Sequence, residues 1–232
     1  MAFVAPSEAI LFMLPALPRY SLGEEIANSV THGTGILLAI AGLAVMTAFA
    51  TLNGNAWHIV ACSIFGGALI LCYTTSTLYH SIQIERVKRV LRALDHSAIF
   101  LLIAGTYTPF TLISLHGAWG WSLFGVIWGL AVVGIALRLL LRGRLHGLVV
   151  GLYLAMGWTM VIAARPMIEH VAPGGLALLA AGGVAYTVGV PFYKWRSLPY
   201  HHAIWHGFVL LGSALHFFAV LFYVIPWPGD GV

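Results

Sequence analysis

Long apolar runs separated by short polar breaks dominate the pattern of this chain. Each run is about 20 residues long, and the breaks carry turn and charge signals such as Asn53-Gly54-Asn55. The runs cover Gly33–Leu52, Trp57–Tyr79, Leu94–Leu115, Trp119–Leu141, Leu145–Ala164, Gly174–Phe192 and His202–Ile225. Because about 20 apolar residues cross a bilayer as a helix, the pattern predicts an all-α bundle of seven transmembrane helices.

The first twenty residues differ from the rest of the chain. Ile10–Leu17 is apolar but short and follows an acidic instead of a basic region, which is a poor match to a signal peptide. We therefore expect an N-terminal arm over 1–20 and one membrane domain over 21–232. The stretch Ser21–Thr31 is expected to be an amphipathic helix that leads into the first span, and it opens on the Ser-x-x-Glu pattern of a capping box.

The composition supports a membrane protein and excludes other classes. Of the 232 residues, 60% are hydrophobic and only 8% are charged, whereas a soluble domain carries about 25% charged residues. The chain is therefore not a soluble enzyme, a disordered chain or a small secreted domain built on disulfides. Its two cysteines, Cys62 and Cys72, lie about 15 Å apart along one helix, which is too far for a disulfide bond.

The basic residues predict the orientation of the bundle. With seven spans, all but one of the 11 Lys and Arg residues fall on the side of the N-terminus, and only Arg165 falls on the other side. The residues on the N-terminal side are Arg19, Arg86, Lys88, Arg89, Arg92, Arg138, Arg142, Arg144, Lys194 and Arg196. The positive-inside rule then places the N-terminus in the cytoplasm and the C-terminus outside. The net charge of +4 reflects this topology and not a nucleic-acid surface.

This topology places polar residues from four segments at one depth, on the cytoplasmic side. They are Glu25, Asn28 and His32 before the first span, Ser76 and His80 at the end of the second, Asp95 at the start of the third, and His202 and His206 at the start of the seventh. Ionisable residues inside spans are costly and usually functional. The spacings of three and four residues put each local set on one helix face.

These residue types suit a metal site. Two histidines four residues apart can bind one zinc ion, and three histidines with a water form a familiar catalytic zinc site. A carboxylate such as Asp95 would hold and deprotonate that water, whose pKa zinc lowers to about 7. Each part also has an ordinary explanation. His202 and His206 could cap loop carbonyls, Asp95 could favour a helix N-terminus, and Glu25 and Asn28 could form the wet face of an interfacial helix. The agreement in depth favours the metal site.

Other histidines fit the site less well. His216 lies ten residues beyond His206, about 15 Å along the helix axis, and is too deep to share its metal. His96 and His201 adjoin candidate ligands but are expected to point to other helix faces.

The ordered set of motifs resembles the progestin and adipoQ receptor family. The motifs are Glu25-x2-Asn28-x3-His32, Ser76-x3-His80 followed by Asp95, and His202-x3-His206. The segment from Leu94 to Pro109 looks like the third span of that family, and the short loops resemble its bacterial hemolysin III branch. The resemblance covers about Ser21 to Tyr223.

The resemblance implies a site, a location and a partner. It implies Zn2+ bound by His80, His202 and His206. It also implies two catalytic residues, Asp95, which holds a water, and Ser76, which lies close to the metal. Glu25, Asn28 and His32 are expected behind the ligands. The resemblance also implies a multi-pass protein of the bacterial inner (plasma) membrane with a membrane lipid as substrate or ligand.

Three functions follow as hypotheses. The first is a zinc-dependent hydrolase of lipid amide or ester bonds, similar to a ceramidase, that acts in membrane lipid homeostasis. The second is a membrane sensor or regulator with a structural zinc and no enzymatic activity. The third is a pore-forming haemolysin, which would need a polar lining through the membrane that the outer halves of these spans do not supply.

Overall fold

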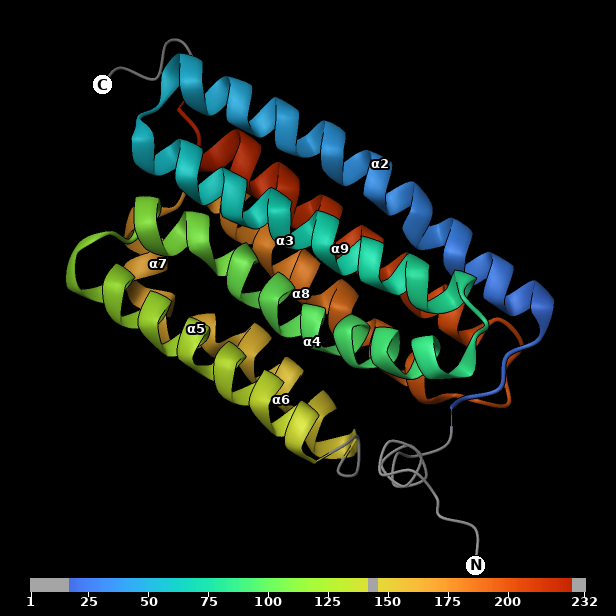
Figure 1. Ribbon diagram of the computed structural model, residues 1–232. Coiled ribbons are helices and arrows are strands. Elements are labelled where there is room, and N and C mark those ends of the chain that lie inside the picture. Colours follow the sequence, from blue (N-terminus) through green and yellow to red (C-terminus); the bar gives the residue numbers. More distant parts are fainter. Residues whose placement is uncertain (1–16, 142–145, 227–232) are drawn as a thin grey trace, which may run out of the picture.

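Seven helices long and apolar enough to cross a membrane lie side by side in the described residues (Figure 1). The structure, a computed structural model, describes residues 17–141 and 146–226. The helices are α2 (Leu22–Asn53), α3 (Ala56–Ser81), α4 (Glu85–Pro109), α5 (Gly117–Leu140), α6 (His146–Trp158), α7 (Ala164–His170), α8 (Pro173–Lys194) and α9 (His201–Tyr223). A π-helical turn, Phe110–Ser114, extends α4, and a 3-10 turn, Thr159–Ala163, joins α6 to α7 into one span.

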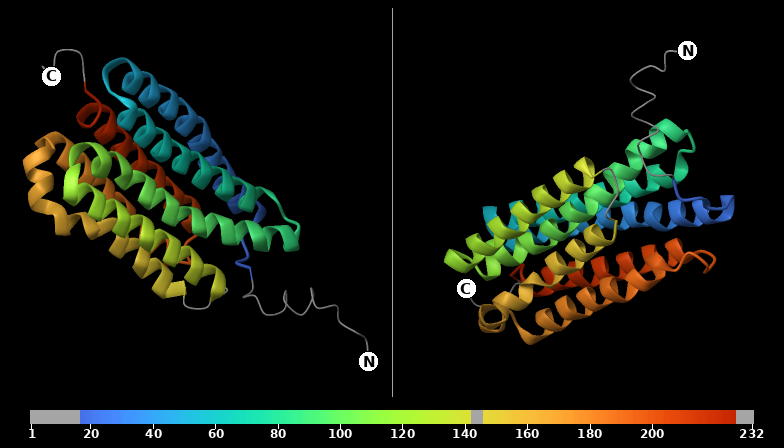
Figure 2. Two further views of the ribbon diagram at one scale, coloured as in Figure 1. Left: turned by 60° about the vertical axis from the view of Figure 1, so that its left-hand side comes forward. Right: turned by 90° about the horizontal axis from the view of Figure 1, so that it is seen from below.

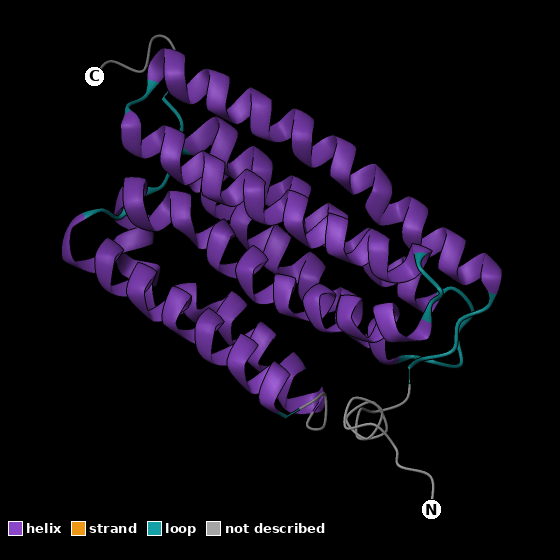
Figure 3. Ribbon diagram, in the orientation of Figure 1, coloured by secondary structure: helices purple, strands orange, loops and turns teal. Residues whose placement is uncertain are grey.

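The predicted fold class is confirmed. The described residues contain no strand and seven spans that form an all-helical bundle (Figure 3). The start of α2 and the end of α9 lie at opposite ends of the bundle, as an odd number of spans requires (Figure 1). Most of the predicted N-terminal arm, residues 1–16, lies outside the described residues, as do Arg142 and Arg144.

Two of the spans begin earlier than predicted. The separate helix over Ser21–Thr31 and the span over Gly33–Leu52 are one continuous helix, α2. The basic stretch before Leu94 is not a break but the first two turns of α4. This stretch is helical because it is amphipathic: Glu85 and Arg89 form an ion pair four residues apart, while Lys88 is buried.

The fifth span ends later than predicted. It continues past Ala164 to His170, through a segment that was expected to be a break. An ion pair four residues apart, with Arg165 Nε 3.0 Å from Glu169 Oε1, supports this last helical stretch.

A complete capping box fixes the start of α2. The backbone nitrogen of Glu24 donates to Ser21 Oγ, 3.3 Å away, and the backbone nitrogen of Ser21 donates to Glu24 Oε2, 2.8 Å away. The first buried side chains of the helix follow at once, and they are polar: Glu25, Asn28 and His32. The cap therefore sets the register of a buried polar face.

The packing of the helices brings α2, α3 and α9 together. α2 packs along α3 and against α9, α8 packs along α9, and α4 lies between α3 and α5. The views in Figure 2 show α2, α3 and α4 on one side of α9, with α8 on the other. The end of α3 and the beginnings of α2, α4 and α9 consequently meet at one end of the bundle.

Candidate metal centre

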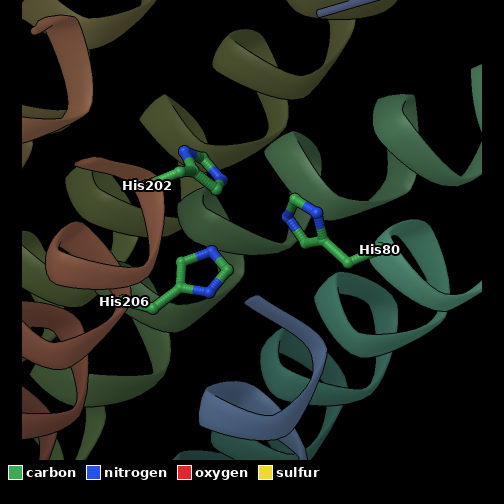
Figure 4. Close-up of side chains that lie close together, drawn as sticks. All are labelled: His80, His202 and His206. Carbon is green, nitrogen blue, oxygen red and sulfur yellow. The ribbon is translucent and has the colours of Figure 1, made fainter. Parts of the chain in front are cut away.

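Three buried histidines converge at this end of the bundle (Figure 4). His80 lies in the last turn of α3, whereas His202 and His206 lie in the first two turns of α9. Each offers one ring nitrogen, and these nitrogens all lie within 4.8 Å of one another. The i, i+4 spacing on α9 supplies two ligand positions, and the packing of the bundle supplies the third.

The ring nitrogens that have no hydrogen-bond partner indicate whether a metal ion fits the cluster. His80 Nε2 and His202 Nδ1 are buried and have no hydrogen-bond partner among the described residues. Leaving such atoms unsatisfied costs about 1–3 kcal/mol each, and a bound metal ion would satisfy both. Three neutral imidazoles in a tetrahedral set with one open position are a common donor set for Zn2+. The residues present therefore fit a metal ion.

Hydrogen bonds behind two of the histidines orient their rings. His80 Nδ1 lies 2.7 Å from Glu25 Oε2, and His206 Nδ1 lies 3.3 Å from the backbone oxygen of Asn28. In metal sites the nitrogen that does not bind the metal usually donates to a carboxylate or a carbonyl in this way, which fixes the tautomer of the ligand. Both contacts leave Nε2 as the nitrogen available to a metal.

The structure places the other motif residues around this cluster in different ways. The ring of His32 stacks on that of His206, with centroids 3.6 Å apart, and neither of its nitrogens has a hydrogen-bond partner in the described chain. Ser76 is buried one turn before His80, and its hydroxyl also has no partner among the described residues. Asp95 is buried on α4.

A mostly apolar cavity connects Asp95 with the histidine cluster. Helices α4, α6, α8 and α9 supply most of its wall, and Asp95, His202 and His206 lie in that wall. On α4 the lining reaches from Asp95 to Tyr107, a rise of about 18 Å. One leaflet of the hydrocarbon core is about 15 Å deep, half of a core of about 30 Å. The lining on α4 therefore extends over about the depth of one leaflet.

Three other histidines, His32, His96 and His216, also line the cavity. His216 lies at its deep end, where Nε2 donates to the backbone oxygen of Leu179 over 3.1 Å, and it is not part of the cluster. His96, which was expected to point to another helix face, has Nδ1 only 3.4 Å from Asp95 Oδ2. The same nitrogen donates to the backbone oxygen of Arg92 over 2.9 Å, which holds the ring beside Asp95.

Sequence reasoning missed two neighbours of the cluster. The ring of Tyr20 lies 5.7 Å from that of His80 and 5.3 Å from that of His202, and burial raises the pKa of its phenol well above the usual value. Lys88 is buried and ion-paired with Glu25. Lys88 is seven residues before Asp95 and shares its helix face, but the positive-inside rule accounts equally well for its charge, so this spacing alone does not identify it. For Tyr20 the sequence offers no comparable signal.

Comparisons with known proteins agree with the motif set. Residues 20–217 match the family model described as Haemolysin-III related. The chain is 47% identical over 209 residues to the Hemolysin-3 homolog of Bacillus subtilis (strain 168). The aligned region covers 90% of this chain and 98% of that protein. It is also 47% identical over 203 residues to Hemolysin-3 of Bacillus cereus, covering 88% of this chain and 93% of the relative.

A more distant relative comes from an animal. The chain is 29% identical over 224 residues to the monocyte to macrophage differentiation factor of Homo sapiens, covering 93% of this chain and 92% of that protein. The predicted resemblance is thus confirmed across nearly the whole chain. With seven helices of membrane-spanning length and this match, the protein belongs to the haemolysin III family of multi-pass membrane proteins.

Proposed function

We propose that this protein is a zinc-dependent hydrolase that cleaves an amide or ester bond of a membrane lipid and acts in membrane lipid homeostasis. His80, His202 and His206 would hold the Zn2+. One observation carries the proposal: His202 and His206 of the histidine cluster line an apolar cavity whose wall also holds a buried carboxylate, Asp95. A purely structural metal would need neither the cavity nor the carboxylate.

The chemistry divides between the metal and the protein. When bound, Zn2+ acts as a Lewis acid and lowers the pKa of a water ligand to about 7. Asp95 would accept the proton of the water that adds to the acyl carbon, and would return it to the departing amine or alcohol as the C–N or C–O bond breaks. His96, 3.4 Å from Asp95, would hold the carboxylate in place. The products are a fatty acid and an amine or alcohol.

The location of the site agrees with a lipid substrate. The apolar cavity would hold the acyl chain within one leaflet, and the labile bond would lie at the membrane boundary beside the cluster. The helix ends on this side carry Arg86 and Arg89 on α4 and Lys194 on α8, so the positive-inside rule supports a site on the cytoplasmic side of the bacterial inner membrane.

The test combines metal analysis with lipid mass spectrometry on the purified protein. We expect about one zinc per chain and release of fatty acid from a ceramide or another acyl lipid. Asp95→Asn should keep the zinc and lower turnover by about 10²–10⁴-fold, the usual contribution of a general base. His80→Ala should lose the zinc, while His170→Ala, at the opposite end of the bundle, should behave like the wild type. Wild-type turnover by Asp95→Asn would remove the proposed base.

A regulator with a structural zinc is the second candidate. The observation in its favour is that the cluster joins α3 to α9, so a bound metal would cross-link two helices far apart in sequence. This candidate predicts that chelation lowers the unfolding temperature and that no lipid product forms under any condition. Tight zinc binding without product would favour it over the hydrolase.

A further inference from the structure

The membrane topology does not explain why Lys88 is buried. The positive-inside rule needs charges at this end of the bundle, but it does not need them buried. Arg86, two residues earlier, is exposed, whereas Lys88 is only 4% exposed. A buried ammonium is costly unless it is paired, so its partners indicate what it does.

The ammonium of Lys88 has three partners. It forms an ion pair with Glu25 Oε1, donates to Gln83 Oε1 over 2.9 Å, and lies 5.2 Å from the centroid of the Tyr79 ring. Glu25 is on α2, and Lys88 is on α4. The side chain therefore ties the start of α4 to the polar face of α2.

A continuous path leads from Lys88 to a candidate ligand. Glu25 contacts Lys88 with Oε1 and His80 Nδ1 with Oε2, the latter over 2.7 Å. Gln83 closes a second path, because its Nε2 donates to the backbone oxygen of His80 over 2.7 Å while its Oε1 accepts from Lys88. Glu25 thus connects the ammonium of Lys88 to the ring of His80, and Gln83 connects it to the backbone of His80.

The direction of these bonds decides which nitrogen of His80 faces the site. The ion pair fixes the carboxylate of Glu25 so that Oε2 points at the ring, and a carboxylate only accepts hydrogen bonds. Nδ1 also lies 3.3 Å from Asn28 Nδ2, but its contact with Glu25 Oε2 is shorter, at 2.7 Å. Nδ1 then donates to the carboxylate, and Nε2 keeps its lone pair for a metal. A carboxylate behind a histidine ligand also raises the basicity of that ligand.

We propose that Lys88 is a positioning residue of the metal centre: it holds Glu25 against His80 and thereby strengthens metal binding. This inference rests on the part of the proposed function that assigns a Zn2+ to the three histidines, and it is independent of whether the protein hydrolyses lipids. Lys88 itself contacts neither metal nor substrate.

The first experiment measures the zinc dissociation constant by chelator competition on the full-length protein in detergent. Lys88→Met should weaken zinc binding by about 10–100-fold, as is typical when the partner of a ligand is lost. Arg86→Met removes an exposed charge of the same sign from the same turn and should stay within about twofold of wild type. Lys88→Arg, which keeps the charge, should recover most of the affinity. Wild-type affinity in Lys88→Met would overturn the proposal.

A double-mutant cycle tests whether Lys88 acts through Glu25. Glu25→Gln should weaken zinc binding to a similar extent, and Lys88→Met should cause no further loss in the Glu25→Gln background. An additional tenfold loss in the double variant would show that Lys88 acts by another route, which would also overturn the proposal. The double variant removes both charges together, so it avoids leaving an unpaired buried charge that prevents folding.

The results separate this proposal from the proposed function. A wild-type protein that binds no zinc overturns both. Tight zinc binding without lipid hydrolysis overturns the hydrolase alone, and the pattern of zinc affinities in the Lys88 and Glu25 variants then still decides the role of Lys88.

Discussion

The imidazole rings of His32 and His206 lie face to face, with centroids 3.6 Å apart and planes inclined by only 11°. Tyr73 packs against His32 with a centroid distance of 5.0 Å. Since neither nitrogen of His32 has a hydrogen-bond partner among the described residues, its contact with the candidate ligand is made by the ring face. His32 thus holds the plane of His206 from a neighbouring helix.

This stacking predicts that the ring of His32 matters and its nitrogens do not. His32→Phe should keep zinc affinity within about threefold, because an aromatic face still covers His206. His32→Ala should weaken zinc binding more strongly and lower stability by about 3 kcal/mol, the usual cost of deleting a large buried ring. Chelator competition and thermal unfolding provide the two measurements. Equal loss of zinc in both variants would mean that a nitrogen of His32 takes part in binding.

If the cavity holds the acyl chain, a substitution in its wall should block lipid binding without changing metal binding. Gly157 lines the cavity, and a Cβ added there meets no atom within 4 Å. A leucine at this position would project into the space proposed for the acyl chain. Displacing two methylene groups costs about 1.6 kcal/mol, so turnover of a long-chain lipid should fall more than tenfold. Zinc content should not change.

Gly151 offers the matched control for this experiment. It lies on α6, as Gly157 does, and it is equally unobstructed, but it is not part of the cavity wall. Gly151→Leu should therefore keep wild-type turnover. If the two leucine variants lose activity together, or if neither does, the acyl chain binds elsewhere.

The spans could be predicted from sequence because they depend on length and hydrophobicity alone. The capping box predicted where α2 begins, and this is confirmed. The continuity of α2 could not be predicted, since Glu25, Asn28 and His32 interrupt the apolar pattern in the way that a surface segment does. Their side chains are buried because α3, α9 and each other satisfy or surround them, which is a tertiary effect. In the sequence, such a polar stretch looks like the end of a membrane span, although in the structure it is helical and buried.

The candidate ligands could be predicted in part. The i, i+4 spacing brings His202 and His206 together on any helix, whereas the approach of His80 depends on how α3 packs beside α9 and followed only from the shared depth and the family motifs. Lys88 could not be recognised, because the positive-inside rule accounts equally well for it and for Arg86. Only burial distinguishes the two.

The contact between α4 and α5 supports the helix that carries Asp95. A Cβ added at Gly134 of α5 would lie 2.2 Å from Cε1 of Phe100, whose ring is fully buried on α4 and packs on Tyr153 with a centroid distance of 4.5 Å. The ring has no room to retreat. The absence of a side chain at Gly134 is therefore what lets the two helices approach closely.

This contact predicts a difference between two glycines of one helix. Gly134→Ala should lower the free energy of unfolding by about 1–3 kcal/mol, the usual cost of overpacking. Gly125→Ala, also on α5 but with no atom within 4 Å of the added Cβ, should be neutral or stabilising by up to about 1 kcal/mol, because alanine favours the helix. Thermal unfolding in one detergent compares the two. Equal unfolding temperatures would mean that α5 does not press on Phe100, and that the position of Asp95 depends on α3 and the remaining neighbours of α4 instead.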